Sequence, residues 1–172
     1  KILNYMSCLI SSIHYCPVKS LSYQSLNSCN IKKNLGIIND RVFAFSRGID
    51  LDKAKLIEKN PNERKLNHLL TLKNSPSLNK YNFVYKNDEL SLIKNDEKLI
   101  SISINNLEEY SNLSNKLIEL ESSLLKPIFL LKNQVFPFFD TSHSNNVFNS
   151  MSLINLNSLK DFELKINKKI EL

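Results

Sequence analysis

The sequence predicts a mainly β protein of the α+β class, built as a β-barrel or curled antiparallel sheet with one or two packed helices. Residues 81–104 read as three alternating runs separated by "KND" and "KNDE", which predicts an antiparallel three-stranded meander. A second strand signal, "DRVFAFS", lies between the only two glycines of the chain, Gly36 and Gly48. From Asn105 the apolar residues recur every three or four positions, which indicates a helix.

The first elements are short strands. An apolar run predicts a strand over Leu9–Tyr15, which must end before Pro17 because proline lacks the N–H that a sheet ladder needs. A second strand is expected within Ser25–Ile31. In the strand that begins at Arg41, alternate side chains face opposite ways, with Phe43 and Phe45 on one side.

In the rest of the chain, the pattern of apolar and polar residues is clear in some segments and weak in others. Residues 50–80 predict one short strand or helix among loops. The helix after Asn105 is expected to have Asn105 as its cap, Glu109 and Glu119 in water, and an inward stripe of Leu107, Tyr110, Leu113, Leu117, Leu120 and Leu124. "KPIFLLK" reads as a strand, and "DTSHSNNVFNS" as a linker or long loop. A last helix is expected over Ser150–Ile166, capped by Asn149, with Leu156, Leu159, Phe162 and Ile166 turned inward.

Composition excludes several classes of function. The 172 residues allow one medium domain, or one small domain and part of another. The net charge of +6 comes mainly from scattered Lys, without a basic run or interleaved aromatic residues, which argues against nucleic-acid binding. No apolar run reaches the length of a membrane span. The three cysteines form no CxxC or zinc-type cluster, so a metal site is not expected, and an odd cysteine count suits a reducing, cytoplasmic setting.

Four motifs in order resemble the MOSC family, the molybdenum cofactor sulfurase C-terminal domain, with its N-terminal β-barrel partner. "PVKS" follows the first strand, where the family has Tyr-Pro-x-Lys-Ser, and "GIINDR" matches its Gly-x-x-x-Asp-Arg signature. "DTS" and "SLINLN" match a later loop and helix, after a meander that leads to one helix. The resemblance implies an N-terminal β-barrel domain over 7–133 and the beginning of a MOSC β-barrel over 138–172.

The resemblance implies a molybdenum cofactor (molybdopterin) site, and the residue chemistry agrees with it. The cofactor is a pterin with a dithiolene and a phosphate, so its pocket needs fixed cations and donors. Lys19 supplies a point charge, and Arg41 a planar fork for phosphate or pterin oxygens. Ser20, Thr141 and Ser142 supply hydroxyl and backbone donors. Taken singly, these motifs are also typical of a solvated turn, a surface ion pair and a polar loop.

Two departures from the family limit what is carried over. Cys16 stands where the family has tyrosine before the proline, and we interpret it as a small packed residue. The family's Phe-Arg-Pro-Asn segment and its molybdenum-ligating cysteine come after the position of Leu172, so no metal ligand and no catalytic residue is assigned. We therefore expect the chain to be a fragment of a longer protein and to be inactive alone.

The resemblance implies that the parent protein is an oxidoreductase. Relatives of this architecture include the mitochondrial amidoxime-reducing component, which reduces N-hydroxylated compounds with electrons from a separate redox partner protein. Two alternatives remain open at this point. One is a non-enzymatic carrier of cofactor or sulfur, and the other is a basic β-barrel that binds nucleic acid.

Overall fold

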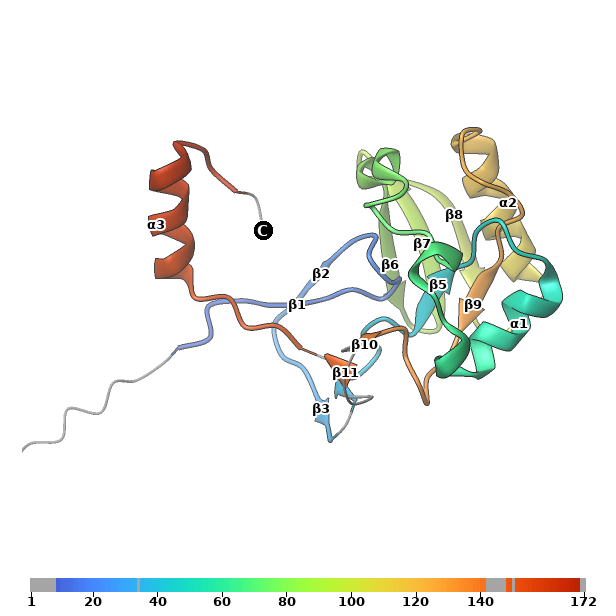
Figure 1. Ribbon diagram of the computed structural model, residues 1–172, viewed down its shortest axis with the longest axis horizontal. Helices are drawn as coiled ribbons and strands as arrows, with labels where there is room; N and C mark the ends of the chain where they lie inside the picture. Colours follow the sequence, from blue (N-terminus) through green and yellow to red (C-terminus); the bar gives the residue numbers. More distant parts are fainter. Residues whose placement is uncertain (1–8, 34, 142–147, 150, 171–172) are drawn as a thin grey trace, which may run out of the picture.

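The structure, a computed structural model, describes residues 9–33, 35–141, 148–149 and 151–170, with 140–141 and 148–149 described by their backbone alone (Figure 1). The strands in these ranges are β1 Ile13–Tyr15, β2 Gln24–Leu26, β3 Ile31–Lys32, β4 Gly36–Ile37, β5 Phe43–Phe45, β6 Asn82–Lys86, β7 Glu89–Lys94, β8 Glu97–Ser103, β9 Leu130–Lys132, β10 Asp140–Thr141 and β11 Phe148–Asn149. The α-helices are α1 Leu51–Lys59, α2 Glu109–Leu120 and α3 Leu156–Ile166. Short 3-10 helices cover Pro61–Glu63, Leu66–His68 and Pro76–Lys80.

The predicted class is confirmed: strands and helices are mixed, and the named strands pair antiparallel in small sheets. Four sheets have two strands each, β1–β2, β3–β4, β5–β9 and β10–β11, and β6–β7–β8 has three. The sequence left open a barrel or a curled sheet. Across the ranges that the structure describes, the sheets do not close into a barrel.

Strand β5 lies at the centre and separates two clusters of core residues. Phe43 and Phe45 face a large cluster that includes α2 and the β6–β7–β8 sheet, whereas Ala44 faces a smaller one with Ile57 of α1 and Phe138. One edge of β5 pairs with β9. The other edge forms a parallel bridge from Phe43 to Val18 and an antiparallel bridge from Ser46 to Leu69. The predicted alternation is confirmed for Phe43, Ala44 and Phe45, and both faces of β5 are buried. The strand begins at Phe43 and not at Arg41, whose φ is left-handed, and Val42 belongs to the large cluster.

The predicted meander is confirmed, and its turns follow from their residue types. Asn87-Asp88 joins β6 to β7, and Asn95-Asp96 joins β7 to β8. All four residues have left-handed φ angles between 50° and 63°. A two-residue hairpin turn of type I′ needs positive φ at both positions, and Asn and Asp tolerate it better than most residues with a side chain.

Helix α2 covers the large cluster, but its beginning differs from the prediction. It starts at Glu109, so Leu107 precedes it and is 75% exposed. The cap is not Asn105; instead, the side-chain oxygen of Asn106 accepts the backbone N–H of Glu108 at 3.1 Å. Glu109 is not simply in water either, because its carboxylate accepts the backbone N–H of Ser103 at 2.7 Å. Tyr110, Leu113 and Leu117 are buried as predicted.

Side chains cover the outer edges of two short strands. On β6, the backbone N–H of Phe83 donates to Ser22 Oγ at 2.7 Å, and that of Tyr85 donates to Gln24 Oε1 at 2.9 Å. On β9, the N–H groups of Leu130 and Lys132 donate to Ser114 Oγ (3.0 Å) and Glu58 Oε1 (2.7 Å). These bonds satisfy N–H groups that a neighbouring strand would otherwise have to pair.

Helix α1 and its anchor are the main features that the weak pattern of residues 50–80 did not resolve. Asp50 caps the helix by accepting the Lys53 N–H at 2.7 Å. Arg64 then donates to the carbonyls of Ile57 (2.9 Å) and Glu58 (3.0 Å) in the last turn of α1. It also donates to the Pro137 carbonyl at 2.9 Å, and its guanidinium lies 4.1 Å from the Phe138 ring centroid. Arg64 therefore ties α1 to the segment that leads into β10.

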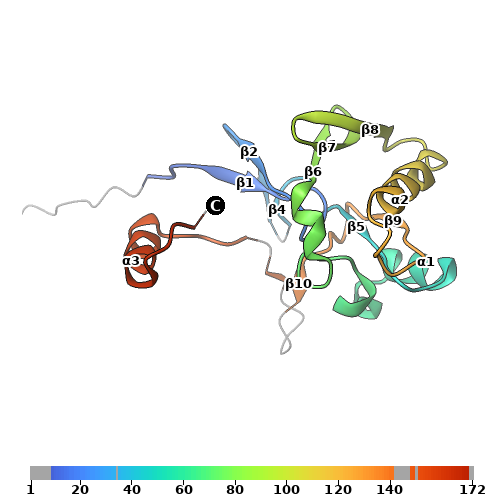
Figure 2. The same ribbon diagram turned by 90° about the horizontal axis from the view of Figure 1, so that it is seen from above.

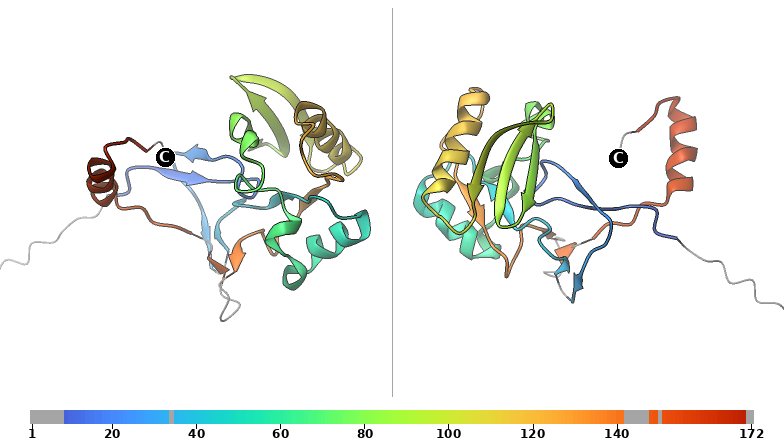
Figure 3. Two further views of the ribbon diagram at one scale, coloured as in Figure 1. Left: turned by 45° about the horizontal axis from the view of Figure 1, so that its top comes forward. Right: turned by 180° about the vertical axis from the view of Figure 1, so that it is seen from behind.

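The ends of the described chain lie outside this core. The β1–β2 ribbon projects from it, and α3 stands apart from the other helices and the β6–β7–β8 sheet (Figures 2 and 3). The expectation for the last helix was wrong in two respects. It begins at Leu156, capped by Asn155, whose oxygen accepts the N–H groups of Asn157 and Ser158, and not after Asn149. None of its residues is buried, and Phe162 is 51% exposed.

We expect Leu117→Ala to lower the free energy of unfolding by about 2–5 kcal/mol, because Leu117 is fully buried in the large cluster and its truncation leaves a cavity. Urea unfolding followed by circular dichroism measures the loss. Leu107→Ala is the matched control, since the same atoms are removed from an exposed side chain just before α2. Equal losses for the two variants would contradict the described packing of α2.

Candidate functional site

The two motifs expected to carry the site lie side by side. The Arg41 N–H donates to the Cys16 carbonyl at 2.6 Å, and the Phe43 N–H to the Pro17 carbonyl at 3.0 Å. The Lys19 N–H donates to the Phe43 carbonyl at 2.8 Å. Residues 16–19 therefore run parallel to the start of β5. The segment that carries Lys19 and Ser20 and the segment that carries Arg41 are brought together by backbone hydrogen bonds.

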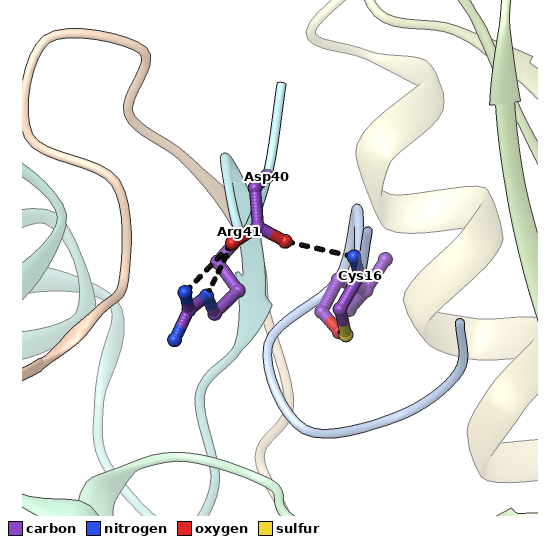
Figure 4. Close-up of polar contacts among 4 residues, drawn as sticks. Cys16, Asp40 and Arg41 are labelled. Atoms are coloured by element: carbon purple, nitrogen blue, oxygen red, sulfur yellow. Dashed lines mark hydrogen bonds and ion pairs between the residues drawn. The ribbon is translucent and has the colours of Figure 1, made fainter. Parts of the chain in front are cut away.

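Asp40 joins these two segments through its side chain (Figure 4). Its Oδ1 accepts the backbone N–H of Cys16 at 2.8 Å. Its Oδ2 accepts from Arg41 Nε at 2.7 Å and lies 2.7 Å from the Arg41 Nη2 nitrogen. Asp40 is buried, so this is a partly buried ion pair and not a solvated pair on the surface.

Arg41 occupies a restricted position. Its φ angle is 52°, in the left-handed region that residues with a Cβ adopt at a cost. The guanidinium lies 4.5 Å from the centroid of the Phe139 ring, within the range of a cation–π contact. The Arg41 carbonyl accepts the Phe138 N–H at 2.7 Å. The backbone on both sides of the residue and the guanidinium itself are thus held by neighbouring groups.

Lys19 and Ser20 form the turn after β1, as predicted, but they differ in exposure. Lys19 is only 2% exposed, which is unusual for a lysine side chain. Ser20 is exposed and has a left-handed φ of 58°. The turn therefore holds one ammonium group away from bulk water and presents a serine beside it.

The third predicted segment is described only in part. Thr141 belongs to β10, where it pairs with Phe148, but only its backbone is described, and Ser142 lies outside the described residues. Thr141 follows Phe138 by three residues, and the Phe138 N–H binds the Arg41 carbonyl. Three residues of chain span at most about 11 Å. The backbone of Thr141 is thus near Arg41, and the expected direction of its donors stays a prediction.

The two cysteines that the structure describes are Cys16 and Cys29, and they differ in burial. Cys16 is buried, its thiol donates to the Val18 carbonyl at 2.8 Å, and burial raises its pKa. Cys29 is a half-buried free thiol, and Cys8 lies outside the described residues. Within the ranges that the structure describes, no group of three or more His, Cys, Asp and Glu side chains is placed to hold a metal ion.

Sequence reasoning missed two contributors to this site. Taken singly, Asp40-Arg41 is typical of a local surface ion pair, and nothing in the sequence indicates that Asp40 also accepts the N–H of Cys16, 24 residues earlier in the chain. Phe139 was not singled out, although "FF" directly precedes "DTS" in the sequence. An open cleft of about 430 Å³ lies elsewhere, lined by residues from α1, α2 and the end of β9, and none of the predicted site residues lines it.

Comparison with known proteins does not extend this description. No family model matches the chain, and neither a curated protein nor a solved structure matches it significantly. Among the described helices, none has the length and apolar character needed to cross a membrane.

The packed state of Cys16 makes its reactivity predictable. Because the thiolate is the reactive form and burial disfavours it, we expect iodoacetamide to leave Cys16 unmodified in the folded protein at pH 7.5 while it alkylates Cys29. Mass spectrometry of tryptic peptides distinguishes the two sites. In urea both should react. Rapid native alkylation of Cys16 would contradict its role as a packed residue.

Tyr15, next to Cys16, makes stability depend on alkaline pH. Its hydroxyl lies 2.8 Å from Gln24 Oε1 and 3.1 Å from the Tyr85 carbonyl oxygen, and burial together with Asp40 raises its pKa from 10.0 to about 12. The unfolded chain therefore loses this proton first, and its contribution to stability, complete below pH 10, falls between pH 10 and 12.

We expect Tyr15→Phe to make the decline in unfolding free energy over this range shallower by at most about 1.4 kcal/mol per pH unit, the value for one proton. Urea unfolding at pH 9, 10 and 11 measures the slope. Some slope should persist in the variant, because the pKa values of Tyr85 and Tyr110 are also raised to about 12. An unchanged slope would show that Tyr15 titrates alike in both states.

Proposed function

We propose that this chain supplies the anion-binding part of a molybdenum cofactor site of MOSC type. The observation that carries the proposal is the pairing of the two signature segments. "PVKS" and "NDR" are far apart in sequence, yet Cys16, Pro17 and Lys19 are hydrogen-bonded to Arg41 and Phe43. This pairing puts the two cationic residues of the motifs on adjacent backbone segments. A site for one anionic group needs that arrangement.

The residues present fit the phosphate end of such a cofactor. A guanidinium offers paired N–H donors that match phosphate oxygens, and the Arg41 guanidinium is held in place by Asp40 and Phe139. An ammonium group shielded from water, as in Lys19, interacts more strongly with an anion than one in bulk solvent. Ser20 adds an exposed hydroxyl in the same turn, where its φ angle is 58°.

The proposal assigns binding and orientation, not redox chemistry, to these residues. When bound, the cofactor supplies the oxidation and reduction chemistry at its metal. Lys19 and Arg41 neutralise the phosphate, and Ser20 orients it, with Thr141 and Ser142 as further proposed donors from the loop after Phe139. No residue of this chain is assigned as a metal ligand. Reduction of N-hydroxylated compounds with a separate electron donor is the reaction that we propose this cofactor site serves, on the basis of the resemblance to MOSC proteins.

A titration with a phosphorylated pterin tests the proposal. We expect saturable changes in the amide NMR signals of Lys19, Ser20 and Arg41, whereas the same pterin without phosphate should leave them unchanged. Absence of saturable changes at these residues up to millimolar ligand would overturn the proposal. When the chain is expressed with a cofactor supply, we expect no reductase activity and less than stoichiometric molybdenum. Stoichiometric molybdenum would contradict this expectation, and Cys8, Cys16 and Cys29 would then have to be tested one by one as ligands.

Arg41→Lys should weaken binding of the phosphorylated pterin about tenfold, because a lysine ammonium cannot reproduce the planar pair of donors. Arg47→Lys is the matched control, since it makes the same change at another half-buried arginine. Arg47 follows β5 in the sequence, whereas Arg41 precedes it. The dissociation constants come from the same NMR titration. Equal affinities for wild type and Arg41→Lys would remove Arg41 from the proposed site.

A further inference from the structure

The Asp40 carboxylate is an unexpected group to find in a site for an anion. Its two oxygens are both used, one by the Cys16 N–H and the other by the Arg41 guanidinium. A negative charge this close to Arg41 lowers the local positive potential and so opposes the approach of a phosphate. If the site worked by charge alone, Asp40 would weaken it.

The geometry around Arg41 points to a different role. An arginine side chain has several rotatable bonds, and fixing it when a ligand binds costs free energy. Asp40 already fixes the Nε–Nη2 edge of the guanidinium, and the Phe139 ring lies against its face at 4.5 Å. The same carboxylate fixes the backbone of Cys16, which leads into the turn that carries Lys19.

We infer that Asp40 is a positioning residue for anion binding: it orients the Arg41 guanidinium and sets its place relative to the Lys19 turn, with Phe139 as the second support. This inference rests on the proposed function, because it concerns the same anion site. It goes beyond the motif by assigning Asp40 a net favourable effect on the binding of an anion. The gain from a guanidinium fixed in advance exceeds the loss from a nearby negative charge.

The test compares two variants that each remove one negative charge. Asp40→Asn keeps an oxygen for the Cys16 N–H but removes the charged partner of Arg41. Glu119→Gln removes an exposed carboxylate of α2 that pairs with Lys116, away from the site. Inorganic phosphate is the probe, and the NMR signal of the Arg41 Nε–H group reports both its binding and the state of the ion pair.

If Asp40 positions Arg41, phosphate affinity falls about two- to tenfold in Asp40→Asn, in spite of the added net positive charge, and stays unchanged in Glu119→Gln. The Arg41 Nε–H signal should also lose its carboxylate-bonded shift in free Asp40→Asn, and Asp40→Glu should restore part of the affinity. Equal or tighter phosphate binding by Asp40→Asn overturns the inference and leaves the proposed anion site in place. No saturable binding by the wild-type protein overturns both.

A second variant keeps the test decisive if Asp40→Asn does not fold. Phe139→Leu retains an apolar side chain but removes the ring beneath the guanidinium. We expect phosphate affinity to fall about two- to fivefold in this variant, with little change in the thermal midpoint. Wild-type affinity in Phe139→Leu would show that the ring does not support Arg41 in binding and would overturn the part of the inference that assigns Phe139 as the second support.

Discussion

The described fold depends on one constraint: the backbone N–H groups along its short strands must find acceptors although few neighbouring strands exist to supply them. Sheets of two or three strands have a high proportion of edges. Ser22 and Gln24 cover the outer edge of β6, while Ser114 and Glu58 cover that of β9. Buried backbone donors without acceptors are costly, so these polar side chains hold the small sheets in one arrangement.

The same principle joins the candidate site to the core. Asp40 accepts a backbone N–H from the end of β1, and Arg64 donates to backbone carbonyls from both α1 and the segment before β10. Burial lowers the pKa of Arg64 to about 10, yet the group stays charged at neutral pH. Phe138 and Phe139 each lie against one of the two guanidinium groups. The segment 137–139 is therefore fixed by two arginines before the chain reaches Asp140.

What the sequence could predict was set by how local the determining interactions are. The Asn-Asp turns of the meander are specified by adjacent residues, and the Leu stripe of α2 by spacing within a single helix, so both were predicted. Helix α1 was not, because its inward side consists of little more than Ala54 and Ile57, and its last turn is completed by Arg64. The cap at Asn155 was missed because several Asn residues nearby were equally suitable by type.

In the candidate site, too, the local features could be predicted from the sequence and the tertiary contacts could not. The motifs containing Lys19 and Arg41 are continuous in sequence and were identified from it. The bond from Asp40 to Cys16 and the contact of Phe139 with Arg41 depend on tertiary structure, and a polar or aromatic residue in sequence does not disclose its distant partner. The apolar residues of α3 show a second limit of prediction from sequence. An amphipathic pattern indicates a helix, but it does not say which surface the helix packs against, and α3 packs against none in the described structure.

The central place of β5 has a consequence for how the chain folds. Strand β5 and the following residue Ser46 are bridged or paired to partners near residues 18, 69 and 130, so every neighbour of this segment is remote in sequence. Closing such long loops lowers the chain entropy before the contacts that offset this cost have formed. Chains dominated by pairings between remote residues therefore fold slowly. The meander, whose turns are local, can form early. The rate-limiting step is then expected to be the late, cooperative assembly of the segments near residues 18, 69 and 130 around β5.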